Sequence, residues 1–326
     1  MTGARRWAVR AAQLTLVAVI GFFVYRALAT DLRGLSWQDV ARWQPDIALL
    51  ALSLILLLTV YIAHAFLWRR IMADLGIGRP SARSAIRIYF VSSLGRYLPG
   101  KLWQLAGIAT LSGREGIPAA PAAASAVIGH LGFLTTGLLL LGALLPRRQI
   151  GGPAILAAAA LLLVGSAAWI LLTMKVGAPF RRGMVRRFGE RLGPRLSGVF
   201  DLAERVRPRH AALWAAAYGA TWIVLGIAFA IFTAAFVPAA LGQTRQLGAT
   251  VAASYLAGYL SFMPGGLGVR ELTMAGMLTE TASIPASASV LVAAASRLWF
   301  TAAELLPLLL VPALPAGAAG APGERA

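Results

Sequence analysis

Two cations flank a Pro-Gly dipeptide inside an apolar part of the chain. Arg96 and Lys101 lie on either side of Pro99-Gly100, within a mostly hydrophobic segment. A charge in such surroundings is costly, so it normally pairs with another charge or faces an aqueous path. The two cations therefore predict contact with a phosphate or another anionic head group.

A second Pro-Gly dipeptide, 165 residues later, is followed by an adjacent cation and anion. Pro264-Gly265 opens a glycine-rich run that ends at Arg270-Glu271. We expect Arg270 to join the two earlier cations on the anion, and Glu271 to orient Arg270 or to take part in proton coupling. The alternative is an internal Arg–Glu pair that only braces the fold.

Both breaks have the backbone chemistry of a helix that stops and reverses. Proline removes an N–H donor and ends the incoming helix, and glycine permits the sharp reversal. The outgoing helix then presents free N–H groups and the positive end of its dipole, which together favour an anion. A simple helix kink is the alternative interpretation.

Further ionisable residues lie on two long apolar segments. Arg297 and Glu304 are seven residues apart, so they share one helix face and need an interior location. His130 and Arg297 occupy equivalent positions in the two halves, although a lone histidine is often only a hydrogen-bonded packing residue. The predicted substrate-binding residues are Arg96, Pro99, Gly100, Lys101, Gln104, His130, Pro264, Gly265, Gly266, Gly268, Arg270, Glu271, Arg297 and Glu304.

Aromatic residues gather near the same segments. They could line a groove for a lipid tail or a sugar, and a belt at the membrane interface is the equally open alternative. These residues are Tyr89, Tyr97, Trp103, Tyr255, Tyr259, Phe262 and Trp299.

The residue types argue against an enzyme or a metalloprotein. Cysteine is absent, and the three histidines, at 64, 130 and 210, show no metal-ligand spacing. Ser92-Ser93 lacks a nearby His–Asp arrangement, and the carboxylates are too scattered for glycosidase chemistry. We expect no catalytic residues, no metal and no cofactor.

Composition and hydropathy place these residues in an all-α, polytopic helical membrane protein. The chain has 326 residues, 59% of them apolar, and a mean hydropathy of +0.73. The net charge of +18 belongs to loops or faces anionic lipids, because no soluble basic domain exists to bind nucleic acid. Six full spans are predicted, at 11–29, 46–67, 119–145, 153–174, 211–237 and 286–312. The two segments that contain the Pro-Gly breaks are predicted as re-entrant helix pairs, at 85–111 and 249–280.

Loop charge orients the spans. The arginine-rich stretch 175–210 and loop 68–84 belong inside, which places both termini in the cytoplasm and makes the two halves inverted repeats. We predict one membrane domain over 1–326, with repeat 1 at about 1–150, repeat 2 at about 151–314 and a flexible tail at 315–326. Inverted repeats with broken helices place a substrate site near the middle of the membrane.

The two motifs resemble those of the lysylphosphatidylglycerol synthase transmembrane family, a flippase-like membrane module. The likeness rests on residues 96–101 (RYLPGK) and 264–271 (PGGLGVRE), and on the span pattern over nearly the whole chain. Many relatives have Gly-Glu soon after the first proline, where this chain has Trp103-Gln104. The resemblance implies a translocator in the plasma membrane that is a stand-alone module without the aminoacyltransferase domain.

Together these observations predict a non-enzymatic translocator of an anionic phospholipid or a polyprenyl-linked glycan. The alternative is a membrane enzyme or accessory subunit in the synthesis of lipid-linked sugars or cell-envelope glycans. The expected partners are the bilayer and the lipid substrate, with a glycosyltransferase or an aminoacyltransferase as a candidate protein partner. The cargo, the direction of transport, the energy coupling and the oligomeric state stay open.

Overall fold

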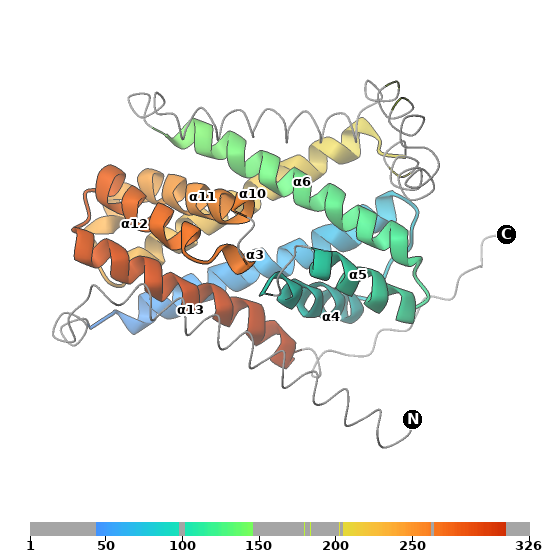
Figure 1. Ribbon diagram of the computed structural model, residues 1–326, viewed down its shortest axis with the longest axis horizontal. Helices are drawn as coiled ribbons and strands as arrows, with labels where there is room; N and C mark the ends of the chain where they lie inside the picture. Colours follow the sequence, from blue (N-terminus) through green and yellow to red (C-terminus); the bar gives the residue numbers. More distant parts are fainter. Residues whose placement is uncertain are drawn as a thin grey trace, which may run out of the picture.

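A computed structural model shows a bundle of packed helices (Figure 1). It describes residues 44–97, 102–145, 205–261 and 264–310, together with residues 179, 183 and 202. Every regular element in these ranges is helical. The predicted class, a helical membrane protein, is therefore confirmed.

Both halves have the same order of elements: a long helix, a broken pair and a second long helix. The first half contains α3 (Ile47–Asp74), α4 (Ala82–Ser93), the 3-10 turn η2 (Leu94–Tyr97), α5 (Leu102–Arg114) and α6 (Ala119–Leu144). The second half contains α10 (Pro208–Ala234), η5 (Pro238–Gln243), α11 (Thr244–Leu260), η6 (Pro264–Gly266), α12 (Val269–Ala282) and α13 (Ala286–Leu310).

Polar side chains fix where helices begin. The Asp46 carboxylate accepts hydrogen bonds from the N–H groups of Ala48 (2.8 Å) and Leu49 (3.1 Å), so it caps α3. The Ser81 hydroxyl accepts from Ser84 N–H and caps α4. Each cap satisfies N–H groups that lack a partner within the helix.

Within the described ranges, four helices are long and apolar enough to cross a membrane: α3, α6, α10 and α13. They match the predicted spans 46–67, 119–145, 211–237 and 286–312. The other two predicted spans, 11–29 and 153–174, lie outside the described residues, as do most of the stretch 175–210 and the tail 315–326.

The helices of the two broken pairs are shorter. α4, α5, α11 and α12 have 12, 13, 17 and 14 residues. At about 1.5 Å per residue they extend roughly 18–26 Å, less than the roughly 30 Å of a hydrocarbon core. The predicted break at Pro264-Gly265 is therefore a real interruption between two short helices. The first predicted break, at Pro99-Gly100, lies outside the described residues, between η2 and α5.

The corresponding long helices α3 and α10 are antiparallel (Figure 1). At one end, Asp46 N–H donates to the carbonyl of Ala235 (2.9 Å). At the other end, Trp214 Nε1–H donates to the Asp74 carboxylate (3.0 Å). Equivalent helices of the two halves thus run in opposite directions, which is the relation that inverted repeats require.

The core between the halves contains a tight aromatic contact. The rings of Phe133 on α6 and Trp222 on α10 stack with centroids 4.4 Å apart, and Trp222 Nε1–H donates to the Phe133 carbonyl. Gly137 makes this possible, because a Cβ there would lie 2.3 Å from the indole ring. Such packing fixes the long helices around the broken pairs.

Candidate functional site

The two helix breaks meet at the centre of the molecule. η2 from the first half lies against η6 from the second, beside α13. Arg297 on α13 donates from Nη1 to the carbonyl of Gly265 in η6 (2.9 Å). This bond satisfies a carbonyl that the interrupted helix leaves without a partner.

A charged pair joins the first break to α13. Arg96 Nη1 donates to Glu304 Oε1 at 2.7 Å, and Tyr97 O–H donates to Glu304 Oε2, also at 2.7 Å. The Glu304 side chain is 4% exposed and that of Arg96 is 25% exposed. The carboxylate is thus fully engaged, while the guanidinium keeps access to the site.

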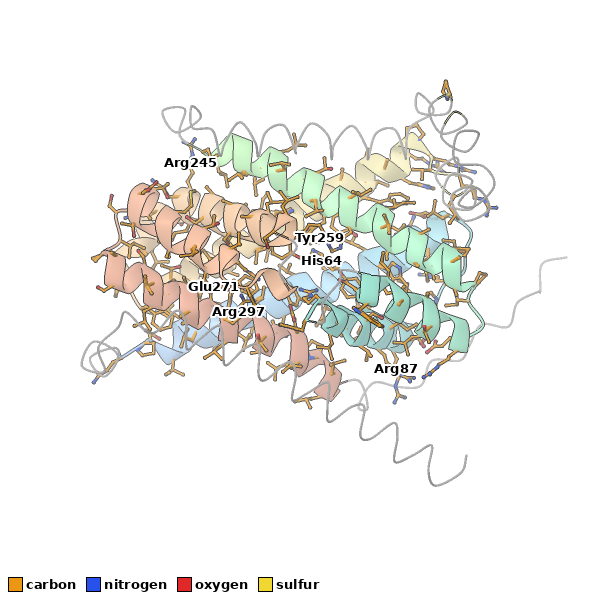
Figure 2. All side chains as sticks on the ribbon, in the orientation of Figure 1. His64, Arg87, Arg245, Tyr259, Glu271 and Arg297 are labelled. Carbon is orange, nitrogen blue, oxygen red and sulfur yellow. The ribbon has the colours of Figure 1, made fainter. Side chains whose placement is uncertain are left out.

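A second charged pair joins the second break to α13. Arg297 Nη2 forms an ion pair with Glu271 Oε1, and the two side chains are 5% and 4% exposed. The other oxygen of Glu271 accepts a hydrogen bond from Gly268 N–H (2.8 Å). Glu271 therefore caps α12 and binds α13 at the same time (Figure 2).

Arg270 is held differently. Its guanidinium carbon lies 3.6 Å from the ring centroid of Phe300 and 5.5 Å from that of Tyr255. Its Nε and Nη2 atoms are buried and have no hydrogen-bond partner among the described residues. Cation–π contacts attract the charge without using its N–H donors, so these donors stay available to an anion.

Close backbone packing brings Arg270 to this position. Gly266 has φ +71°, and a Cβ there would lie 2.9 Å from Gly258 Cα. A Cβ on Gly258 would in turn lie 3.0 Å from Arg270 Cβ. Only glycine allows α11, η6 and α12 to approach this closely.

A cavity of about 100 Å³ lies where these groups converge. Three arginines and Glu304 line it, and Glu271 lies just behind Arg297 as its ion-pair partner, so these described charges leave one excess positive charge. Its lining comprises Arg96, Tyr97, Gln104, His130, Tyr255, Gly258, Tyr259, Gly265, Gly266, Arg270, Arg297, Phe300, Thr301 and Glu304. We call it the charged cavity.

A second cavity, of about 210 Å³, adjoins the first. The two share Arg96, Gln104, His130, Tyr255 and Tyr259. Figure 2 shows His64 and Tyr259 near the middle of the molecule, with Arg87 and Arg245 toward its periphery. The residues found only around this aromatic cavity include Tyr61, His64, Trp68, Tyr89, Phe90, Phe133 and Tyr218.

A comparison with known protein families identifies the fold. Residues 10–306 match the model described as the lysylphosphatidylglycerol synthase TM region. The chain belongs to the lysylphosphatidylglycerol synthase transmembrane family. No curated protein and no solved structure matched the chain. As a lysylphosphatidylglycerol synthase transmembrane protein, the chain is a multi-pass membrane protein of a family linked to lipid and cell-envelope biosynthesis or translocation.

In this family member, most of the residues proposed from the sequence lie together. Pro264 begins η6, and Gly268 and Glu271 form the start of α12 beside the cavity. Pro99, Gly100 and Lys101 lie outside the described residues. The proposed residues that line the charged cavity are Arg96, Gln104, His130, Gly265, Gly266, Arg270, Arg297 and Glu304.

Two expectations about the second break need correction. Glu271 pairs with Arg297 and not with Arg270, because adjacent residues of a helix point in different directions. The start of α12 is also not fully open to an anion, because the Glu271 carboxylate already accepts from Gly268 N–H there. The free cationic donors belong to the Arg270 side chain instead.

The aromatic expectation holds for some residues only. Tyr89, Tyr97, Tyr255 and Tyr259 line the cavities, whereas Trp103 is 54% exposed. Trp299 packs in the core, with its ring centroid 4.8 Å from that of Phe232. Phe262 lies outside the described residues.

Sequence reasoning missed the α3 wall of the aromatic cavity. Tyr61, His64 and Trp68 lie on an uninterrupted apolar span, where no break or charge draws attention to them. Their spacing of three and four residues places them on one helix face. That row of aromatic rings with polar tips was the signal available in the sequence.

Proposed function

We propose that this protein is a translocator that moves an anionic phospholipid or a lipid-linked glycan between leaflets, and is not an enzyme. The observation that carries this proposal is the Arg270 guanidinium, whose buried Nε and Nη2 atoms have no hydrogen-bond partner among the described residues, beside a cavity between the two halves. A buried charge is normally paired, so a buried guanidinium whose donors are free implies an anionic ligand that binds and is released. A phosphate head group supplies that charge.

The remaining groups of the site support the same reading. Two ion pairs tie the broken helices to α13, so the cavity has a fixed frame. One excess positive charge suits a phosphate inside the apolar bundle, and the lipid tails can stay in the bilayer. The inverted relation of the halves favours alternating access around a fixed central site.

We also propose that the two broken pairs are re-entrant, with both termini in the cytoplasm. The start of α4 and the end of α5 lie near each other, because a Cβ on Gly78 would contact Ile117. The chain lacks cysteine, so single cysteines can report sidedness. Arg79→Cys and Glu115→Cys should label from one face, and Thr244→Cys and Glu280→Cys from the other; labelling of the first two from opposite faces would exclude a re-entrant first pair.

Leaflet exchange in liposomes tests the function. The purified protein should accelerate the exchange of fluorescent phosphatidylglycerol, read as the fraction protected from a membrane-impermeant reductant. Arg270→Gln should lower the rate by at least about tenfold, since one charge-assisted contact contributes about 1.5–3 kcal/mol. Arg87→Gln, which removes an exposed arginine of α4, is the matched control and should leave the rate unchanged.

Two results would count against the translocator. One is an exchange rate equal to that of protein-free liposomes for phosphatidylglycerol, phosphatidylinositol and a polyprenyl phosphate alike. The other is an Arg270→Gln variant that transports at the wild-type rate and is present at the wild-type level, which would remove Arg270 from the site.

A further inference from the structure

The aromatic cavity differs in charge from its neighbour. Among the described residues of its lining, Arg96 is the one arginine, lysine, aspartate or glutamate, and its guanidinium is already bonded to Glu304. No aspartate or glutamate belongs to the part of the lining that the structure describes. A cationic group would find no counter-charge there, and a second anion would find no free cation, so the cavity suits a neutral group.

Aromatic side chains make up much of its lining. The rings of Tyr61 and His64 lie in stacked orientation with centroids 6.4 Å apart, and Tyr89 meets Phe90 edge to face at 6.0 Å. Such faces pack against flat, weakly polar surfaces. The C–H faces of a sugar or cyclitol ring are surfaces of this kind.

The same walls offer hydrogen-bonding groups. The Tyr61 hydroxyl is buried on a side chain that is 8% exposed, and it has no hydrogen-bond partner among the described residues. A buried hydroxyl without a partner is costly, so a bound polar group or water is expected beside it. Tyr61 lines the aromatic cavity, so a group bound in that cavity lies beside this side chain.

His64 contributes an acceptor. The Thr221 hydroxyl donates its single proton to the Tyr218 carbonyl (2.8 Å), so the contact of His64 Nε2 with Thr221 Oγ1 (3.1 Å) requires Nε2–H to donate. The neutral ring then has Nδ1 as an acceptor. A donor-acceptor hydroxyl on Tyr61 and an acceptor on His64 match the hydroxyl groups of a sugar.

Five residues line both cavities, so one molecule can occupy both. We propose that the aromatic cavity is a subsite for a neutral, polyhydroxylated ring, a sugar or a cyclitol, joined through a phosphodiester to the lipid. This inference rests on the proposed function, in which Arg270 holds the phosphate. It excludes an aminoacylated head group, whose ammonium would lie among neutral side chains.

Binding of water-soluble head groups separates the two cavities. We would measure affinities of the full chain in detergent micelles for glycerophosphoinositol, glycerophosphoglycerol and glycerophosphocholine, which share the phosphodiester and differ beyond it. Glycerophosphoinositol should bind about tenfold more tightly than glycerophosphoglycerol, because a site that hydrogen-bonds hydroxyl groups discriminates against a ligand that lacks the ring. Glycerophosphocholine should bind most weakly.

The Tyr61→Phe variant keeps the ring and removes the hydroxyl, which has no partner to lose within the described protein. It should weaken glycerophosphoinositol about five- to tenfold, as expected for one hydrogen bond, and leave glycerophosphoglycerol unchanged. Arg270→Gln should weaken both ligands equally, and Arg87→Gln neither. In liposomes, wild-type protein should exchange phosphatidylinositol faster than phosphatidylglycerol, and Tyr61→Phe should remove that difference.

The outcomes distinguish the subsite from the function. Equal affinity for glycerophosphoinositol and glycerophosphoglycerol, or a Tyr61→Phe variant that keeps the full preference, would show that the cavity holds water only and would overturn the subsite. Tighter binding of glycerophosphocholine would make the cavity an aromatic box for a cation and would overturn it as well. Both results leave transport of an anionic lipid standing, whereas loss of all binding together with absent exchange would overturn the two proposals at once.

Discussion

The two broken helix pairs share an architecture but hold their charges in different ways. In the first pair, Arg96 finds its carboxylate on α13, 208 residues away. In the second, Glu271 caps its own helix and also pairs with Arg297 on α13. One helix of the second half therefore supplies the counter-charge for both breaks.

The equivalent positions make the difference explicit. The offset of 167 residues that relates His130 to Arg297 also relates Gln104 to Glu271. The first half thus carries glutamine and histidine where the second half carries a buried ion pair. We conclude that the second half serves as the rigid frame, while the first half has no carboxylate at the equivalent position and its Arg96 is more accessible than Arg297.

Breaking the buried pair of the second half should have the largest effect. Arg297→Met leaves Glu271 buried without its main counter-charge and should lower the free energy of unfolding by about 3–5 kcal/mol. Titration with SDS in mixed micelles measures this loss. The double variant Arg297→Met/Glu271→Gln should recover part of it, because the uncompensated charge is gone; a double variant as unstable as the sum of the two single ones would deny the coupling.

Breaking the pair between the halves should cost less. Glu304→Gln removes the carboxylate that binds Arg96 and Tyr97, but Arg96 is more exposed than Arg297 and can turn toward water. We expect a loss of about 2–3 kcal/mol in the same titration. A loss equal to that of Arg297→Met would contradict the view that the first half is held less rigidly.

The breaks and the four described spans could be predicted from the sequence, because proline, glycine and apolar length are local signals. The ion-pair partners of the charged residues could not be predicted from the sequence. Whether Glu271 meets Arg270 or Arg297 depends on how α12 crosses α13, and the partner of Arg96 lies in the other half. The aromatic cavity was not predicted for the same reason, since Tyr61 and Tyr255 line one cavity only after the two halves pack together.

The close approach at the second break is a smaller contribution. Gly266→Ala adds a Cβ 2.9 Å from Gly258 Cα at a positive φ, and should cost about 2 kcal/mol. Gly76→Ala is the matched control, because Gly76 has φ +68° but open space around it. It should cost about 1 kcal/mol from backbone strain alone. Equal losses would show that the packing against Gly258 contributes nothing.

The smallest structural change should reduce the difference between the halves. Gln104→Glu gives the first half the carboxylate that the second half has at the equivalent position, and the new side chain lines both cavities. Its effect on the free energy of unfolding should stay below about 1 kcal/mol, because the side chain keeps its size and borders open space.

Transport should respond more strongly to Gln104→Glu, since the added negative charge cancels the single excess positive charge among the described groups around the charged cavity. We expect exchange of phosphatidylglycerol to fall about fivefold or more, a change of roughly 1 kcal/mol in the interaction with the phosphate. Gln104→Leu removes the amide without adding charge and should retain most of the rate. If Gln104→Glu transports as fast as wild type, the excess charge is not what holds the cargo; if Gln104→Leu loses as much as Gln104→Glu, the amide acts through its hydrogen bonds and the asymmetry between the halves is not electrostatic.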